Sequence, residues 1–158
     1  MSAPRNAWGF TLFCDDLRQE LSGKFSLMGL YTVDMVFPVD FPVTVSKIVF
    51  FVKYYEVKGA FSEDLELKIY FPWDDSDKPS ISQTIKRSNM AGVSQKHPQI
   101  EDDAERINMI NVPIILSPFT AISEGDIRVR ITCGDVTTRL GRLILRKVTP
   151  EDNIQFSA

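Results

Sequence analysis

The sequence has few of the residues that build metal centres. It contains one histidine, His97, and two cysteines, Cys14 and Cys133, among 158 residues. A lone histidine with no cysteine beside it lacks the ligand spacing of a zinc site, and two distant cysteines are too few for a metal cluster. A reducing compartment would keep both cysteines as thiols. The sequence therefore predicts no metal centre and no bound cofactor.

The sequence also lacks the local patterns of common catalytic sites. It has no glycine-rich phosphate loop, no nucleophile elbow and no zinc-protease motif. Cys14 could act as a nucleophile with His97 as its base if the two met in space. However, Cys14 follows the alternation set by Trp8 and Phe10, which indicates a buried, unreactive thiol. We expect no catalytic residue and a non-enzymatic protein.

The acidic residues are grouped, but not in the order of a calcium-binding loop. The segment DDSD at residues 74–77 has oxygen ligands that a calcium ion could use. It has no glycine at the turn and no downstream glutamate in register, so it does not match an EF-hand loop. We interpret this segment as a solvated turn.

Long apolar runs and a strong charge of one sign are both absent. The longest apolar-looking segment, IVFFVKYYEV at residues 48–57, is interrupted by Lys53 and Glu56 and is far too short to span a bilayer. The stretch MSAPRNAWGF does not resemble a signal peptide. The formal net charge is −3, from 18 basic and 21 acidic residues, so nothing general attracts the chain to nucleic acid or to an anionic membrane. We expect a cytoplasmic protein that binds neither.

Two-residue alternation of apolar residues dominates the chain. Three stretches show it: Phe25, Leu27, Tyr31, Val33, Met35 and Phe37; Leu65, Leu67, Ile69, Phe71 and Trp73; and Ile127, Val129, Ile131 and Cys133. This alternation predicts strands with one buried face, whereas the continuously apolar residues 48–52 predict a central strand covered on both faces. Turn signals separate about eight strands. Residues 1–158 are therefore expected to form one all-β sandwich of mostly antiparallel strands, immunoglobulin-like or of a similar Greek-key arrangement.

Two segments, residues 15–21 and residues 87–106, are not assigned by the alternation alone. Ser22-Gly23 predicts a hairpin between the first two strands, although residues 15–21 could instead form a short capped helix. We favour the strand. Residues 87–106, RSNMAGVSQKHPQIEDDAER, have few apolar residues and no period, which predicts a long polar loop. Either it is a mobile excursion between two strands or it binds a partner through Gln95, Lys96 and His97.

The stretch RVRITCGDVTTRLGR, residues 128–142, predicts a tight hairpin with arginines on one face. The Gly134-Asp135 pair suits a two-residue turn and places Arg130 directly across from Arg139. The apolar phase shifts by one residue around Gly141-Arg142, which predicts a β-bulge. Like charges directly opposite each other destabilise a sheet, so something must offset the repulsion. Solvent or a carboxylate such as Glu66 or Glu56 would do so, and so would an acidic partner or an anionic ligand.

The segment FCDDLRQELSGKFSLMGLY, residues 13–31, resembles the opening of a family of small uncharacterised bacterial proteins. The matching positions are Cys14, Asp15, Gly23, Lys24, Ser26, Leu27, Met28, Gly29 and Tyr31. The segment EGDIRVRITCGDVTTRLGRLILRK is similar to the family's final hairpin. Together the two segments cover under a third of the chain, and Met28 replaces the commoner isoleucine. The resemblance implies a β-sandwich in the bacterial cytosol with no established activity, and it assigns no catalytic residue.

These observations predict a binding or assembly module that acts through protein–protein contacts. The candidate binding residues are Arg128, Arg130, Arg139 and Arg142. Exposed strand edges make a homo-oligomer a further expectation. The alternative is a module that binds an anion or a carbohydrate on the sheet face or at the loops at the end of the sandwich. The third interpretation is an enzyme that uses Cys14 or a loop carboxylate.

Overall fold

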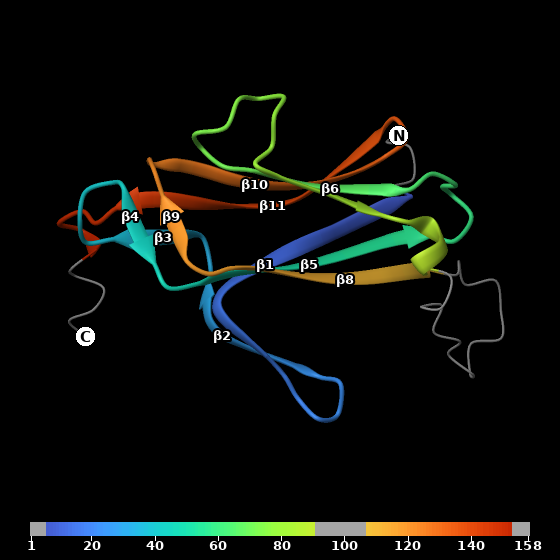
Figure 1. The fold of residues 1–158 in the computed structure, drawn as a ribbon, viewed down its shortest axis with the longest axis horizontal. Coiled ribbons are helices and arrows are strands. Elements are labelled where there is room, and N and C mark those ends of the chain that lie inside the picture. Colours follow the sequence, from blue (N-terminus) through green and yellow to red (C-terminus); the bar gives the residue numbers. More distant parts are fainter. Residues whose placement is uncertain (1–5, 91–106, 153–158) are drawn as a thin grey trace.

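The computed structural model describes residues 6–90 and 107–152, and strands account for most of them (Figure 1). The elements follow in the order β1 (Ala7–Gln19), β2 (Phe25–Tyr31), β3 (Asp34–Phe37), β4 (Val43–Val45), β5 (Ile48–Val57), β6 (Leu65–Tyr70), β7 (Ile81–Ile85), the 3-10 turn η1 (Arg87–Met90), β8 (Ile107–Leu116), β9 (Phe119–Ala121), β10 (Gly125–Cys133) and β11 (Val136–Lys147). The sequence predicted about eight strands, whereas the described residues form eleven. The three shortest strands, β3, β4 and β9, account for the difference, because they have only three or four residues each.

Two sheets lie face to face and share one core, so the predicted all-β sandwich is confirmed (Figure 1). One sheet has four strands in the order β2-β1-β5-β8, and the other has five in the order β3-β11-β10-β6-β7. A third pair, β4 and β9, lies at one end of the molecule. Neighbouring strands are antiparallel except β3, which runs parallel to β11. No helix in the described parts of the chain is long and apolar enough to cross a membrane.

The core confirms most of the alternation in the sequence. Residues 48–52 of β5 are all buried, as expected for a central strand, and β5 lies between β1 and β8. The predicted inward residues of β6 and β10 are also buried: Leu65, Leu67, Ile69, Ile127, Val129, Ile131 and Cys133. β6 and β10 therefore present one face to the core and the alternate residues to the outside.

The prediction of one continuous strand over residues 25–37 was wrong. The chain leaves β2 after Tyr31 and enters β3 at Asp34, and the two strands belong to different sheets. Only Met35 and Phe37 of the alternating set are fully buried, and Phe25 is exposed. The alternation continues through the crossing, so the sequence pattern alone does not reveal where the strand changes sheets.

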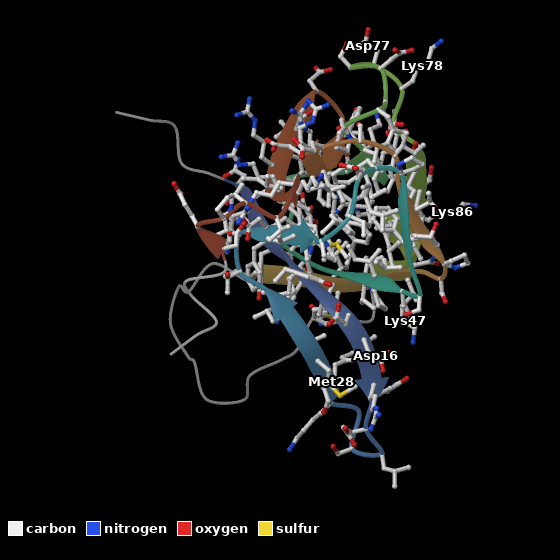
Figure 2. The ribbon with its side chains drawn as sticks, turned by 90° about the vertical axis from the view of Figure 1, so that its left-hand side faces the viewer. Asp16, Met28, Lys47, Asp77, Lys78 and Lys86 are labelled. Carbon is white, nitrogen blue, oxygen red and sulfur yellow. The ribbon has the colours of Figure 1, made fainter. Side chains whose placement is uncertain are left out.

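The first hairpin extends beyond the sheet to which it belongs. Residues 7–14 of β1 pair with β5, whereas Asp16 to Gln19 pair with β2 alone. We call residues 15–31 the β1–β2 arm; it projects away from both sheets in Figures 1 and 2. The helix considered for residues 15–21 does not form, and Gly23 closes the predicted hairpin with a φ of 79°. Within residues 6–90 and 107–152, β2 pairs with β1 alone, and its residues Phe25, Met28 and Leu30 are exposed.

The two sheets come close together where β1 meets β11. A side chain at Gly9 would place its Cβ 2.2 Å from the carbonyl oxygen of Lys53 and 2.8 Å from Cδ2 of Leu140. Only glycine leaves room for this approach. Leu140 is thereby held against the four-stranded sheet, and the outward-facing residues beside it on β11 are held in place as well.

Candidate functional site

The β10–β11 hairpin brings the four predicted arginines together on the outer face of the five-stranded sheet. Arg130 lies directly across from Arg139, as the sequence predicted, and Arg128 lies directly across from Arg142. Gly134 adopts a φ of 57° in the predicted two-residue turn. The result is two consecutive pairs of opposed arginines along one hairpin.

A β-bulge separates these two pairs. Leu140 and Gly141 on β11 together stand opposite Val129 on β10, because the register shifts between Arg128 and Arg130. Gly141 has a φ of 119°, a backbone conformation that other residues rarely adopt. The bulge lies where the sequence predicted it. It lets Leu140 face the core while the arginines on both sides of it, Arg139 and Arg142, face outward.

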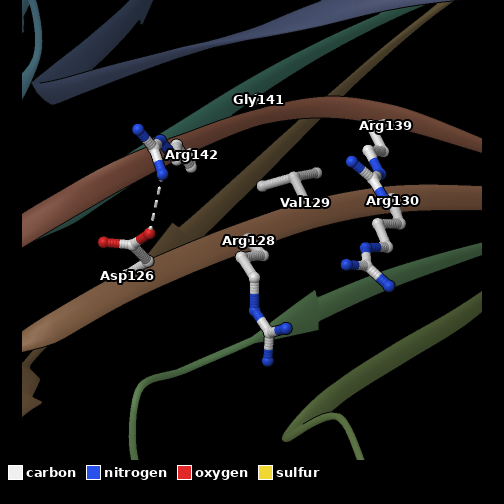
Figure 3. A pocket seen from close by; sticks show the side chains of 7 residues that line it. All are labelled: Asp126, Arg128, Val129, Arg130, Arg139, Gly141 and Arg142. Atoms are coloured by element: carbon white, nitrogen blue, oxygen red, sulfur yellow. Dashed lines mark hydrogen bonds and ion pairs between the residues drawn. The ribbon is translucent and has the colours of Figure 1, made fainter. Parts of the chain in front are cut away.

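The arginines border a hollow of about 300 Å³ on the sheet surface (Figure 3). We call this hollow the arginine groove; it is lined by Asp126, Arg128, Val129, Arg130, Arg139, Gly141 and Arg142. Its lining has four guanidinium groups and one carboxylate, so its charge is strongly positive although the whole chain is acidic. Such a groove attracts anionic groups.

Only part of this positive charge is offset within the fold. Arg142 donates a hydrogen bond to Asp126, with 3.1 Å between Nη1 and Oδ2. The guanidinium carbons of Arg128 and Arg130 lie 5.3 and 5.5 Å from the centre of the Tyr70 ring, which gives both a cation–π contact. Over residues 6–90 and 107–152, no carboxylate oxygen lies within 4.0 Å of a guanidinium nitrogen of Arg128, Arg130 or Arg139.

Neither carboxylate suggested by the sequence neutralises the arginines. Glu66 on β6 pairs with Lys68, with 3.1 Å between Nζ and Oε2, and accepts a hydrogen bond from the hydroxyl of Ser82. Glu56 on β5 belongs to the other sheet, where it is buried and pairs with Arg87. Of the alternatives that the sequence left open, an internal carboxylate at Glu66 or Glu56 is therefore contradicted. Both carboxylates already have closer basic partners.

Asp74 lies near the groove, but its carboxylate is already hydrogen-bonded within its own loop. Its carboxylate accepts hydrogen bonds from the backbone N–H groups of Phe71 and Ser80, both at 2.9 Å, and from the Ser80 hydroxyl at 2.5 Å. Desolvation opposes ionisation, but these hydrogen bonds and the charge of Arg128 outweigh it and lower the pKa of Asp74. Among the described residues, no group of three or more metal-ligating side chains could hold an ion. Asp74 therefore shapes a turn.

The remaining sequence candidates offer little chemistry. Cys14 and Cys133 are both buried, and burial raises the pKa of each thiol, which leaves them poor nucleophiles. The predicted loop residues Gln95, Lys96 and His97 lie outside the described parts of the chain.

Sequence reasoning missed a buried polar cluster at the opposite end of β10, beside η1. Arg87 donates hydrogen bonds to the buried carboxylate of Glu56, to the carbonyl oxygen of Glu63 at 2.9 Å and to Sγ of Cys133 at 3.3 Å. Tyr54 also donates to Glu56, with 3.2 Å between the oxygens, and burial together with this carboxylate raises the pKa of Tyr54. The cluster fixes η1 to both sheets.

One signal in the sequence pointed to this cluster. Glu56 has the same parity as Ile48, Phe50, Val52 and Tyr54, which face the core from β5. A charged residue on an inward parity needs a buried partner of opposite charge. Nothing local identifies Arg87 as that partner, because it is 31 residues away and reaches Glu56 only through the fold.

No protein-family model, no curated protein and no solved structure matches this chain.

Proposed function

We propose that this protein is a binding module that takes an acidic segment of another protein in the arginine groove. One observation carries the proposal: two arginines on β10 lie directly across from two arginines on β11, as Arg128–Arg142 and Arg130–Arg139. Asp126 is the one carboxylate in the groove lining. Directly opposed like charges cost stability. The cost is least offset at Arg139, which has no ion-pair partner among the described residues. A partner with carboxylates would remove the repulsion on binding.

The spacing of the arginines suits an extended chain. Arg128 and Arg130 are two residues apart on β10, and alternate side chains of a strand repeat every ~6.6–6.8 Å. An acidic partner laid along β10 would present alternate carboxylates at the same repeat. Each carboxylate could accept two hydrogen bonds from one planar guanidinium group, a geometry that lysine does not offer.

A small anion is the second candidate for the groove. The hollow of about 300 Å³ is at the lower limit of small-molecule sites. The guanidinium groups would bind phosphate as well as carboxylate. A chain segment is favoured because the arginines are spread over two strands and on both sides of the bulge, and because Arg142 is largely exposed rather than enclosed.

Fluorescence anisotropy with a labelled peptide of alternating Glu and Thr tests the proposal. We expect wild-type protein to bind this peptide, and to bind it less tightly as salt is added, because exposed charges are screened. The Arg130→Glu/Arg139→Glu variant should lose at least about tenfold in affinity. The Lys58→Glu/Lys86→Glu variant changes two exposed lysines outside the groove and carries the same net charge, so it should bind like wild type.

Three outcomes would contradict the proposal. A matched peptide of Gln and Thr that binds equally well would show that carboxylates are not recognised. Equal losses in the two double variants would show that only net charge matters. Calorimetric binding of pyrophosphate together with no binding of the acidic peptide would assign the groove to small anions instead.

A further inference from the structure

The β1–β2 arm carries a strand edge that the fold leaves without a neighbour. In the described parts of the chain, β2 pairs with β1 on one side and stands at the end of the four-stranded sheet. The arm is nevertheless held in place. Asp16 forms a salt bridge with Lys47 at 2.8 Å, and the ring of Phe25 lies 5.2 Å from that of Phe51 on β5. The edge of β2 is therefore presented in a defined position (Figure 2).

Of the other outer strands of the two large sheets, β3, β7 and β8 have features that discourage pairing with another chain, whereas β2 departs from a regular edge only at Gly29, where φ is 67°. Edge strands are commonly protected by shortness, charge or proline. β3 has four residues, and β7 has five and is followed at once by Lys86. β8 contains Pro113, which cannot donate a backbone hydrogen bond. β2, FSLMGLY, has seven residues with no charge and no proline.

Exposed apolar side chains follow the same edge from end to end. Leu21 at the tip of the arm is fully exposed, Leu30 is 52% exposed, and Val33 just after β2 is 61% exposed. Phe25 and Met28 between them are each 37% exposed. Apolar residues gathered along an open edge mark an interaction surface more often than isolated ones do.

A second copy of β2 fits this edge in the antiparallel direction. A two-fold axis at Met28 would place Met28 against itself and Phe25 across from Tyr31 of the other copy. Lys24, the charged residue next to β2, would then face Thr32, so no like charges would meet. The exposed tip at Leu21 would lie near the base of the partner's arm. Two-fold symmetry uses each of these contacts twice.

We propose that the protein forms a homodimer in which the β2 strands of two copies pair antiparallel and join their four-stranded sheets. This surface lies on the sheet opposite the one that carries the arginine groove, so the proposal does not depend on the proposed function. In this proposal, the partner of the β1–β2 arm is a second copy of the same chain.

Sedimentation equilibrium of the full chain tests the dimer. We expect the wild-type dimer to appear within a protein concentration series that reaches about 1 mM. Met28→Lys places two lysines opposite each other across the two-fold axis and should raise the dimer dissociation constant at least about tenfold. Leu30→Lys, at a second exposed position on β2, should weaken the dimer as well. Both sites are exposed in the single chain, so thermal unfolding should confirm that both variants fold.

Ile115→Lys is the matched control on β8, the opposite edge of the same sheet. Ile115 is 50% exposed, so this change adds the same charge to a comparable position. We expect it to leave the dimer unchanged. The proposal is overturned if wild-type protein is monomeric throughout the concentration series, if both β2 variants dimerise like wild type, or if Ile115→Lys is the change that separates the copies.

Discussion

The arginine at η1 and the arginines of the arginine groove stand in contrasting settings. The guanidinium of Arg87 reaches the Glu56 carboxylate, the Glu63 carbonyl oxygen and the sulfur of Cys133, and its backbone N–H donates to Asp64 at 2.7 Å. In the groove, Arg139 has no ion-pair partner among the described residues and stands opposite another arginine.

The difference separates an arginine that the fold requires from arginines that it tolerates. Glu56 is buried, and a buried carboxylate without a counter-charge is strongly destabilising, so Arg87 is needed for folding. The groove arginines are on the outer face, where a threonine or a glutamine would occupy the strand without repulsion. We infer that stability does not explain the presence of Arg139, which agrees with the proposed binding role of the groove.

The largest expected effect is on stability, at Arg87. Arg87→Met would leave Glu56 buried without its cation and should lower the free energy of unfolding by about 3–5 kcal/mol. Urea unfolding followed by circular dichroism measures this change. The double variant Glu56→Leu/Arg87→Met should recover much of the loss, because no buried charge remains. A loss of under about 1 kcal/mol in the single variant would show that Arg87 is as dispensable to the fold as a surface ion pair.

A smaller effect on stability is expected at Asp74, whose carboxylate lies beside the groove and is hydrogen-bonded within its own loop. Asp74→Asn should cost about 1–3 kcal/mol at pH 7, because the hydrogen bonds from Phe71 and Ser80 lose a charged acceptor. The pKa of Asp74 is lowered in the folded protein, so ionised Asp74 contributes stability above its unfolded pKa. That contribution is lost as the pH falls below about 4. Wild type and variant should therefore converge in acid, and a constant gap down to pH 2 would contradict this account.

The smallest expected effect has the opposite sign. Arg139→Gln removes one of two opposed charges and should raise the free energy of unfolding by about 0.2–1 kcal/mol at low salt. Adding salt should reduce this gain by screening the repulsion in the wild-type protein. Arg142→Gln is the matched change, and its gain should be smaller because it also loses the ion pair with Asp126. Destabilisation by Arg139→Gln would mean that the fold uses this arginine.

Local patterns in the sequence were enough to predict the register of the β10–β11 hairpin and its bulge. The turn at Gly134-Asp135 sets the register of the hairpin, and the change of apolar phase near Gly141 locates the bulge, so the pairing of Arg130 with Arg139 followed from neighbouring residues. Strand alternation predicted the core for the same reason. Both features depend on residues close together in the chain.

The features that sequence reasoning missed depend on contacts between distant segments. Tyr70 reaches the arginines from β6, and Arg87 reaches Glu56 from η1. The change of sheet between Tyr31 and Asp34 is hidden because the apolar alternation continues through it. Exposure of the β1–β2 arm depends on where β5 begins, which the arm's own sequence does not encode.

Mapping the contacts of an acidic chain by nuclear magnetic resonance is the most direct test of the role of the groove arginines. The labelled protein would be titrated with the alternating Glu/Thr peptide while its backbone amide signals are followed. The account predicts saturable shifts on β10 and β11, centred on Arg128 to Arg142, and none around Arg87. Shifts spread over all exposed basic residues, or no shifts in the β10–β11 hairpin, would contradict the claim that these arginines serve a partner.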